Sequence, residues 1–160
     1  MAGFELTFEI EGDTQIMRGL SRFADDVKDL SPAFREIAKD FKEIESKQFG
    51  SAGGRGSGGW TPLSPKYAEW KAKHYLGRPL MVLSGLLRES LQGDNPYTIA
   101  DIEPLQVTLG TQIPYAIYHQ LGGGKLPQRR LIDLTEDDKA HWVKLIQQYL
   151  LGKIDEEFGK

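Results

Sequence analysis

Three features are missing from this chain of 160 residues, and each absence excludes a class of protein. There is no cysteine, which excludes disulfides and thiolate metal sites and fits assembly in a reducing cytoplasm. No stretch approaches the ~18 apolar residues of a membrane helix, so we expect no membrane partner. The first residues, MAGFELTFEIEG, alternate apolar and acidic side chains, which is not the pattern of a signal peptide. We expect one domain, residues 1–160, large enough for its own core.

An excess of basic charge is also missing, because the net charge is −3 and the pI is about 5.6. Proteins that bind duplex DNA usually present a basic face. The charge is nevertheless uneven: residues 1–49 carry 7 basic and 11 acidic side chains, residues 50–95 carry 6 and 3, and residues 132–160 carry 4 and 7. A basic middle between acidic ends could favour head-to-tail contacts between subunits, and it also fits an ordinary solvated surface.

Apolar periodicity predicts the fold class. Alternation at residues 4–10 predicts a strand with one wet face, and spacings of three and four predict amphipathic helices at residues 13–30 and 31–49, with Ser31 as the second helix's cap. Residues 97–102 and 106–111 read as a hairpin, residues 130–134 as a last strand, and Thr135 as the cap of a C-terminal helix. We therefore predict an α+β fold: a small, mainly antiparallel sheet packed against one or two long helices, with a C-terminal helix.

The stretch from Trp60 to Leu91 contains two turns bounded by proline and two short predicted helices. Ser64 and Pro65 suit the cap and first residue of a helix that ends near His74, and a second helix follows Ser84-Gly85. Four aromatic residues gather in the first half of the stretch. They could form a small satellite core or an interaction surface, and Trp60 is the one that we most expect at an interface; the others are Tyr67, Trp70 and Tyr75.

Residues 50–59, GSAGGRGSGG, predict a flexible glycine-rich loop without internal support for order. The loop contains a literal Gly-x-Gly-x-x-Gly at Gly54, Gly56 and Gly59. The dinucleotide fingerprint requires a strand before this motif and a helix opening at its end. Here a helix precedes the motif and a Thr-Pro turn follows it. We therefore predict no nucleotide site.

No other pattern in the sequence indicates catalysis or metal binding. The three histidines share no ligand spacing, apart from Asp137 and His141 four residues apart, which is typical of a surface pair. Ser84 lacks the Gly-x-Ser-x-Gly setting of a hydrolase nucleophile, and no partner is signalled for His119 as a base. We therefore expect no enzyme and no cofactor.

Two ordered blocks carry a family resemblance. The first contains Trp-x-Pro-Leu-Ser-Pro-x-Tyr at residues 60–67, then Lys71 or Lys73, then Leu-Ser-Gly-Leu-Leu-Arg-x-Ser at residues 83–90. The second contains Pro-Tyr-Ala at residues 114–116, His-Gln-Leu-Gly at 119–122 and Pro-Gln-Arg-Arg-Leu at 127–131. Together they resemble the phage virion morphogenesis family of tail completion proteins over about 50 residues. Ser84 departs from the threonine that the family more often has before the glycine.

The resemblance implies a structural virion protein of a tailed bacteriophage, located at the tail or the head–tail junction and acting in tail completion or head–tail joining. It implies a ring, commonly of six copies, next to tail-tube and head-completion or connector proteins, with no sequence-specific nucleic acid. The candidate interface residues are Trp60, Tyr67, Arg88, Tyr115, His119, Arg129 and Arg130. We expect the two adjacent arginines, rather than a histidine, to contact an acidic surface on a neighbour. A nucleic-acid-binding module that uses the basic middle segment is the alternative.

Overall fold

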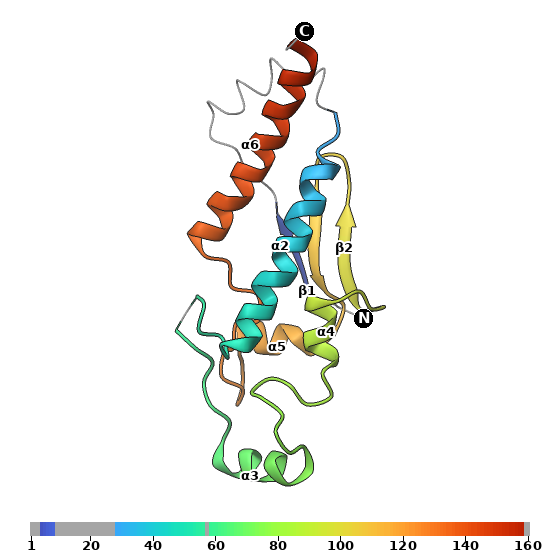
Figure 1. Ribbon diagram of the computed structural model, residues 1–160. Coiled ribbons are helices and arrows are strands. Elements are labelled where there is room, and N and C mark those ends of the chain that lie inside the picture. The colour runs from blue at the N-terminus through green and yellow to red at the C-terminus, as the bar shows by residue number, and fades with distance from the viewer. Residues whose placement is uncertain (1–3, 9–27, 57, 159–160) are drawn as a thin grey trace.

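The computed structural model describes residues 4–8, 28–56 and 58–158, and these form an α+β fold (Figure 1). Three strands pair in the order β1-β3-β2: β1 (Phe4–Phe8), β2 (Thr98–Ile102) and β3 (Val107–Thr111). Both pairings are antiparallel, with Thr111 opposite Phe4 on one side and Thr98 on the other. The predicted antiparallel sheet and its hairpin are confirmed. Residues 9–10, predicted to extend the first strand, lie outside the described residues.

Helix α2 (Ser31–Gly50) is the element on which the core is built. It packs against the sheet, α4 (Leu86–Gln92) and α6 (Glu136–Phe158). Its predicted apolar stripe is buried, since Phe34, Ile37, Phe41 and Ile44 are each at most 3% exposed. From α6, Trp142 packs into the same core and its indole N–H donates to Asp40. The long helix and the C-terminal helix of the prediction are therefore confirmed.

The helix starts differ from the prediction at one of two places. Ser31 does not cap α2, because it is already helical; the Asp29 carboxylate accepts the Ser31 N–H at 2.9 Å instead. Thr135 does cap α6, since its Oγ1 accepts the Asp138 N–H at 3.2 Å while Asp138 accepts the Thr135 N–H at 2.8 Å. Residues 28–30 are not helical, and the rest of the helix predicted at 13–30 lies outside the described residues.

The short helices fall close to where the sequence places them. Helix α3 spans Pro65–His74 with Ser64 at the cap position, and α4 follows Gly85, with the Ser84 hydroxyl accepting the Leu86 N–H at 3.3 Å. Helix α5 spans Ala116–Leu121. None of the helices in the described part of the chain combines the length and the apolar character needed to cross a bilayer.

The prediction of a strand at residues 130–134 is wrong. This segment pairs with no strand in the described part of the chain, and the side chain of Gln120 in α5 takes the place of a partner. The Gln120 Oε1 accepts the N–H groups of Leu131 and Ile132 at 2.8 and 3.0 Å, and its Nε2 donates to the Ile132 carbonyl at 2.8 Å. One amide thus satisfies three backbone groups of a buried segment, which leaves no need for a sheet neighbour.

The glycine-rich loop folds back against the end of α2. The Gly53 N–H donates to the Gln48 carbonyl and the Trp60 N–H to the Ala52 carbonyl, both at 2.8 Å. Gly53 has φ +82°, and a Cβ there would lie 2.3 Å from the Trp60 ring, so only glycine fits. Arg55 forms an ion pair with Asp138 at 2.7 Å. The expectation that the loop has no internal support is therefore wrong, whereas its flexibility stays a prediction.

A buried carboxyl group lies beside this loop. Glu45 of α2 is 0% exposed, and within the described part of the chain neither of its carboxyl oxygens has a hydrogen-bond partner. Burial raises the pKa of Glu45 well above its ordinary value of 4.5; the Arg55 guanidinium opposes this rise and the Asp133 carboxyl adds to it. The carboxyl is therefore protonated in the folded protein at pH values where it would ionise in the unfolded chain.

We expect the stability of the protein to fall as the pH rises through this window. Between the ordinary pKa and the raised folded pKa, only the unfolded state loses the proton, so the free energy of unfolding decreases by up to about 1.4 kcal/mol per pH unit from this group. Glu45→Gln should flatten the decrease when urea denaturation is measured from pH 4 to pH 8. The exposed neighbour substitution Glu43→Gln is the control, and equal pH slopes in the two variants would contradict the assignment.

Candidate functional site

A concavity of about 670 Å³ is lined by α3 and the segment before it, residues 81–85, the start of α4, α5 and the loop after α5. Figure 1 shows these segments at the end of the molecule where α3 projects. These segments include most of both sequence blocks that carry the resemblance. The two blocks are far apart in the chain and meet at this pocket.

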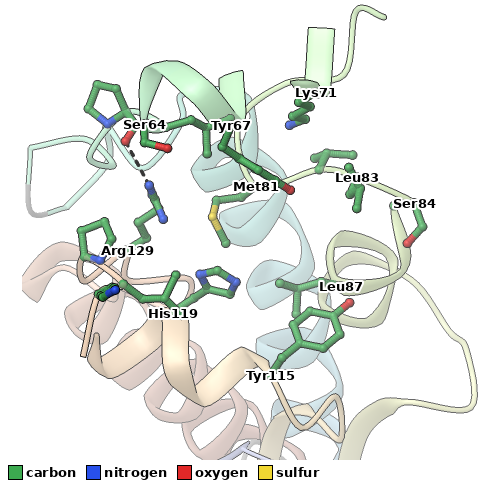
Figure 2. A pocket seen from close by; sticks show the side chains of 17 residues that line it. Ser64, Tyr67, Lys71, Met81, Leu83, Ser84, Leu87, Tyr115, His119 and Arg129 are labelled. Atoms are coloured by element: carbon green, nitrogen blue, oxygen red, sulfur yellow. Dashed lines mark hydrogen bonds between the residues drawn. The ribbon is translucent and has the colours of Figure 1, made fainter. Parts of the chain in front are cut away.

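The walls of the pocket are mainly apolar. Leu63, Met81, Leu87 and Leu126 contribute side chains, and those of Met81 and Leu87 point toward His119 across the space (Figure 2). Met81 has φ +63°, a left-handed conformation that costs a side chain with a Cβ roughly 1–2 kcal/mol. The surrounding structure therefore holds this residue in place at the pocket.

Arg129 joins the two blocks at one wall of the pocket. Its side chain points toward the segment before α3, where Nε donates to the Thr61 carbonyl at 2.7 Å and Nη2 to the Pro62 carbonyl at 3.0 Å (Figure 2). The residue is only 5% exposed, and burial lowers the pKa of its guanidinium. The hydrogen-bonding edge of Arg129 therefore faces its own chain, and its predicted contact with a neighbour stays a prediction.

His119 lies on α5, opposite this wall. Its carbonyl accepts the Arg129 N–H at 2.7 Å, a contact made possible by Gly122, whose φ of +72° turns the chain and whose Cβ would lie 2.8 Å from the Gln128 nitrogen. Burial, together with the charge of Arg129, lowers the pKa of His119 below its ordinary 6.5, so the ring is neutral at pH 7. Its Nδ1 has no hydrogen-bond partner in the described part of the chain.

This neutral ring lacks the companions that catalysis requires. The hydroxyl of Ser84 also lines the pocket, but its hydrogen bond goes to the backbone of α4, and none is formed with His119. A nucleophile and its base must lie within hydrogen-bond reach of each other. In the described residues there is also no group of three His, Asp or Glu side chains placed to hold a metal ion.

Lys71 is the one buried residue of α3. Its Nζ donates to the Pro79 carbonyl at 2.5 Å, and burial lowers its pKa. The structure thereby distinguishes between the two lysines that the sequence left open, because Lys73 is exposed and pairs with Glu69 on the helix surface. Lys71 serves the pocket, since it ties α3 to the segment that carries Met81.

Four of the seven predicted interface residues lie at this pocket: Tyr67, Tyr115, His119 and Arg129. The two tyrosines are exposed at its rim, at 41% and 44%. The other three predicted residues, Trp60, Arg88 and Arg130, do not line it. Of these, Arg88 is half-buried on α4 and Arg130 is exposed, 3.7 Å from Asp133.

Trp60 is part of the core. It is 7% exposed, its ring meets the Phe49 ring edge-on at 5.1 Å, and its indole N–H donates to the Arg130 carbonyl at 2.7 Å. Trp60 is thus buried in the single chain, and its predicted place at an interface stays a prediction. The predicted aromatic cluster persists without it on α3, where Trp70 stacks between Tyr67 and His74 at 5.4 and 5.0 Å.

Sequence reasoning missed two apolar residues of the pocket, Met81 and Leu126. Neither belongs to a periodic stripe, because each lies in a turn or loop whose course depends on distant contacts. The proline and glycines beside them indicated turns, but they did not indicate that the two turns face one cavity.

Comparison with known families gives one result. The model of the phage virion morphogenesis family matches residues 12–151, which is most of the chain. No curated protein and no solved structure shows significant similarity to this chain.

We expect Arg129→Ala to lower the free energy of unfolding by about 3 kcal/mol, because it removes two charge-assisted hydrogen bonds and leaves two carbonyls without partners. Arg130→Ala should change it by less than about 0.5 kcal/mol, since that side chain is half exposed and its ion pair is long. Urea denaturation followed by circular dichroism measures both. Equal effects of the two changes would show that the guanidinium of Arg129 does not hold the two blocks together.

Proposed function

Because this chain belongs to the phage virion morphogenesis family, we propose that it completes the tail or joins it to the head of a tailed bacteriophage. In this proposal it is a non-enzymatic ring subunit, assembled in the host cytoplasm and carried in the virion. Its neighbours would be further copies of itself, tail-tube proteins and head-completion or connector proteins. A ring of six copies follows the resemblance noted above.

The observation that carries the proposal is the surface around the pocket. Large apolar side chains are exposed on α3, on α5 and in the loops beside them, including Trp70 at 41%, Leu76 at 90%, Tyr118 at 61% and Leu121 at 63%. Apolar groups gathered on one face of a protein mark interaction sites. Both blocks of the resemblance contribute to this surface, as expected if subunit contacts are what the family's motifs maintain.

We propose a non-enzymatic role because of how the polar groups at the pocket are bonded. Lys71 and Arg129 donate to backbone carbonyls, and the neutral His119 lacks a hydroxyl partner among the described residues. These groups connect segments of the protein, and none is arranged to activate a nucleophile. Their arrangement suits a preformed docking surface better than a reaction site.

The experiment compares two exposed tyrosines in the phage whose genome encodes the chain. Tyr67→Asp alters the pocket rim, and Tyr97→Asp alters a site outside the pocket with nearly the same exposure, 41% against 43%. We expect Tyr67→Asp to lower the yield of infectious particles by about tenfold or more, because it places a charge in an apolar contact. Filled heads and separate or irregular tails should accumulate in electron micrographs.

Tyr97→Asp should leave infectivity unchanged, and both purified variants should keep the unfolding temperature of the parent protein. Normal particles from a stably folded Tyr67→Asp variant would contradict a docking role for this surface. Normal particles after complete loss of the chain would contradict the proposed function itself.

Nucleic-acid binding is the second candidate, and the distribution of charge favours it. Residues 60–88 carry five basic side chains against the single acidic residue Glu69, and residues 114–131 carry three basic residues and no acidic one. A surface that binds phosphates loses affinity steeply as the salt concentration rises. Titration with duplex DNA at two salt concentrations distinguishes the candidates, because the assembly role predicts no binding at physiological salt.

A further inference from the structure

We propose that the pocket receives the C-terminal end of helix α6 from a second copy of this chain. The inference rests on the proposed self-assembly and names the segment that would make the contact. The partner in this proposal is a helix end whose sequence combines apolar and acidic residues.

The positively charged lining of the pocket favours a negatively charged partner. Its lining includes Lys71, Lys125 and Arg129 but no aspartate or glutamate. The hydrogen bonds of Lys71 and Arg129 go to neutral carbonyls, which satisfy the N–H groups without cancelling the positive charges. Lys125 is exposed at the rim. Because the cavity carries a surplus of positive charge, it attracts a partner that brings carboxylates and repels a basic one.

The last turns of α6 offer that combination. Asp155, Glu156 and Glu157 follow one another there, and no basic residue lies in the last turn. Carboxylates at the C-terminal end of a helix are unfavourable in the free subunit, because the helix dipole places negative charge at the same end. Cations from a neighbour would relieve this repulsion, which gives the contact an electrostatic driving force.

Apolar residues accompany these acids. Leu151 is 59% exposed, and the positions of Ile154 and Phe158 follow it at i+3 and i+7, the spacing with which helices anchor in apolar grooves. The pocket volume of about 670 Å³ lies within the range of roughly 300–1,000 Å³ that is usual for sites accepting several such groups.

The two surfaces lie at opposite ends of the molecule, with the end of α6 at the top and α3 beside the pocket at the bottom (Figure 1). The end of α6 therefore cannot fill the pocket of its own chain. Contact between two such different surfaces leaves one of each free on every pair, so further copies can be added until a ring closes. In this arrangement the basic pocket of one copy faces the acidic end of α6 of the next copy.

The chain has no cysteine, so every disulfide formed by a double-cysteine variant involves the introduced positions, and peptide mapping of the cross-link identifies the 126–157 pair. We would combine Leu126→Cys at the pocket with Glu157→Cys at the end of α6 and oxidise the full-length protein. The control pair combines Leu126→Cys with Gln148→Cys, an exposed position earlier on α6. We expect disulfide-linked dimers and larger species to form about tenfold faster or more in the first pair, because docking raises the local thiol concentration.

Charge reversal in the same background tests the electrostatic part. Lys125→Glu alone and Asp155→Lys alone should each slow the cross-link several-fold, and the two changes in one chain should restore it. Cross-linking no faster than in the control pair would overturn the proposed contact. Rates insensitive to both reversals would overturn the claim that charge selects the partner.

The outcomes also separate this inference from the function on which it rests. If the chain is required for tail completion but the pair does not cross-link, another surface joins the subunits and the proposed function stands. If the pair cross-links but complete tails form without the chain, the contact is real and the proposed function is wrong.

Discussion

The double hydrogen bond from Arg129 to the carbonyls of Thr61 and Pro62 is the constraint on which the pocket depends. It joins segments separated by up to 68 residues and fixes the chain just before α3 against the loop that follows α5. Helix α3 has a single buried residue, Lys71, so little else in the helix itself holds it to the body. A buried guanidinium with two carbonyl partners thus does the work that an apolar interface does for the larger helices.

The same use of polar side chains as connectors recurs elsewhere in the fold. Gln120 satisfies three backbone groups of the segment after Arg130, and the Trp60 indole satisfies the Arg130 carbonyl. Each bond links α5 or the region before α3 to the segment that leads into α6. The irregular segments are therefore held by side-chain-to-backbone hydrogen bonds in addition to the apolar packing of residues such as Trp60 and Leu131.

These side-chain-to-backbone bonds limit how much of the structure the sequence could predict. The stripe on α2, the hairpin, the start of α3 and the cap of α6 follow from local patterns, and each was found within about two residues. The prediction of a strand at 130–134 failed because the side chain of Gln120 takes the backbone hydrogen bonds that a strand partner would make, which no local pattern indicates. The burial of Arg129 could not be predicted for a related reason, since sequence shows the charge but not the carbonyls to which it donates. Four of the seven candidate residues nonetheless meet at the pocket.

The anchoring of α6 by its first half has a mechanical consequence. Trp142 and Ile146 are buried against α2, while Leu151 is largely exposed. From Trp142 to the end at Phe158 the helix extends for about 24 Å at roughly 1.5 Å per residue. A helix of this kind acts as a rigid spacer, and its length sets the distance between the core of the protein and whatever touches its tip. Lengthening it by one residue would also turn the tip by about 100°, so both reach and direction are encoded in a residue count.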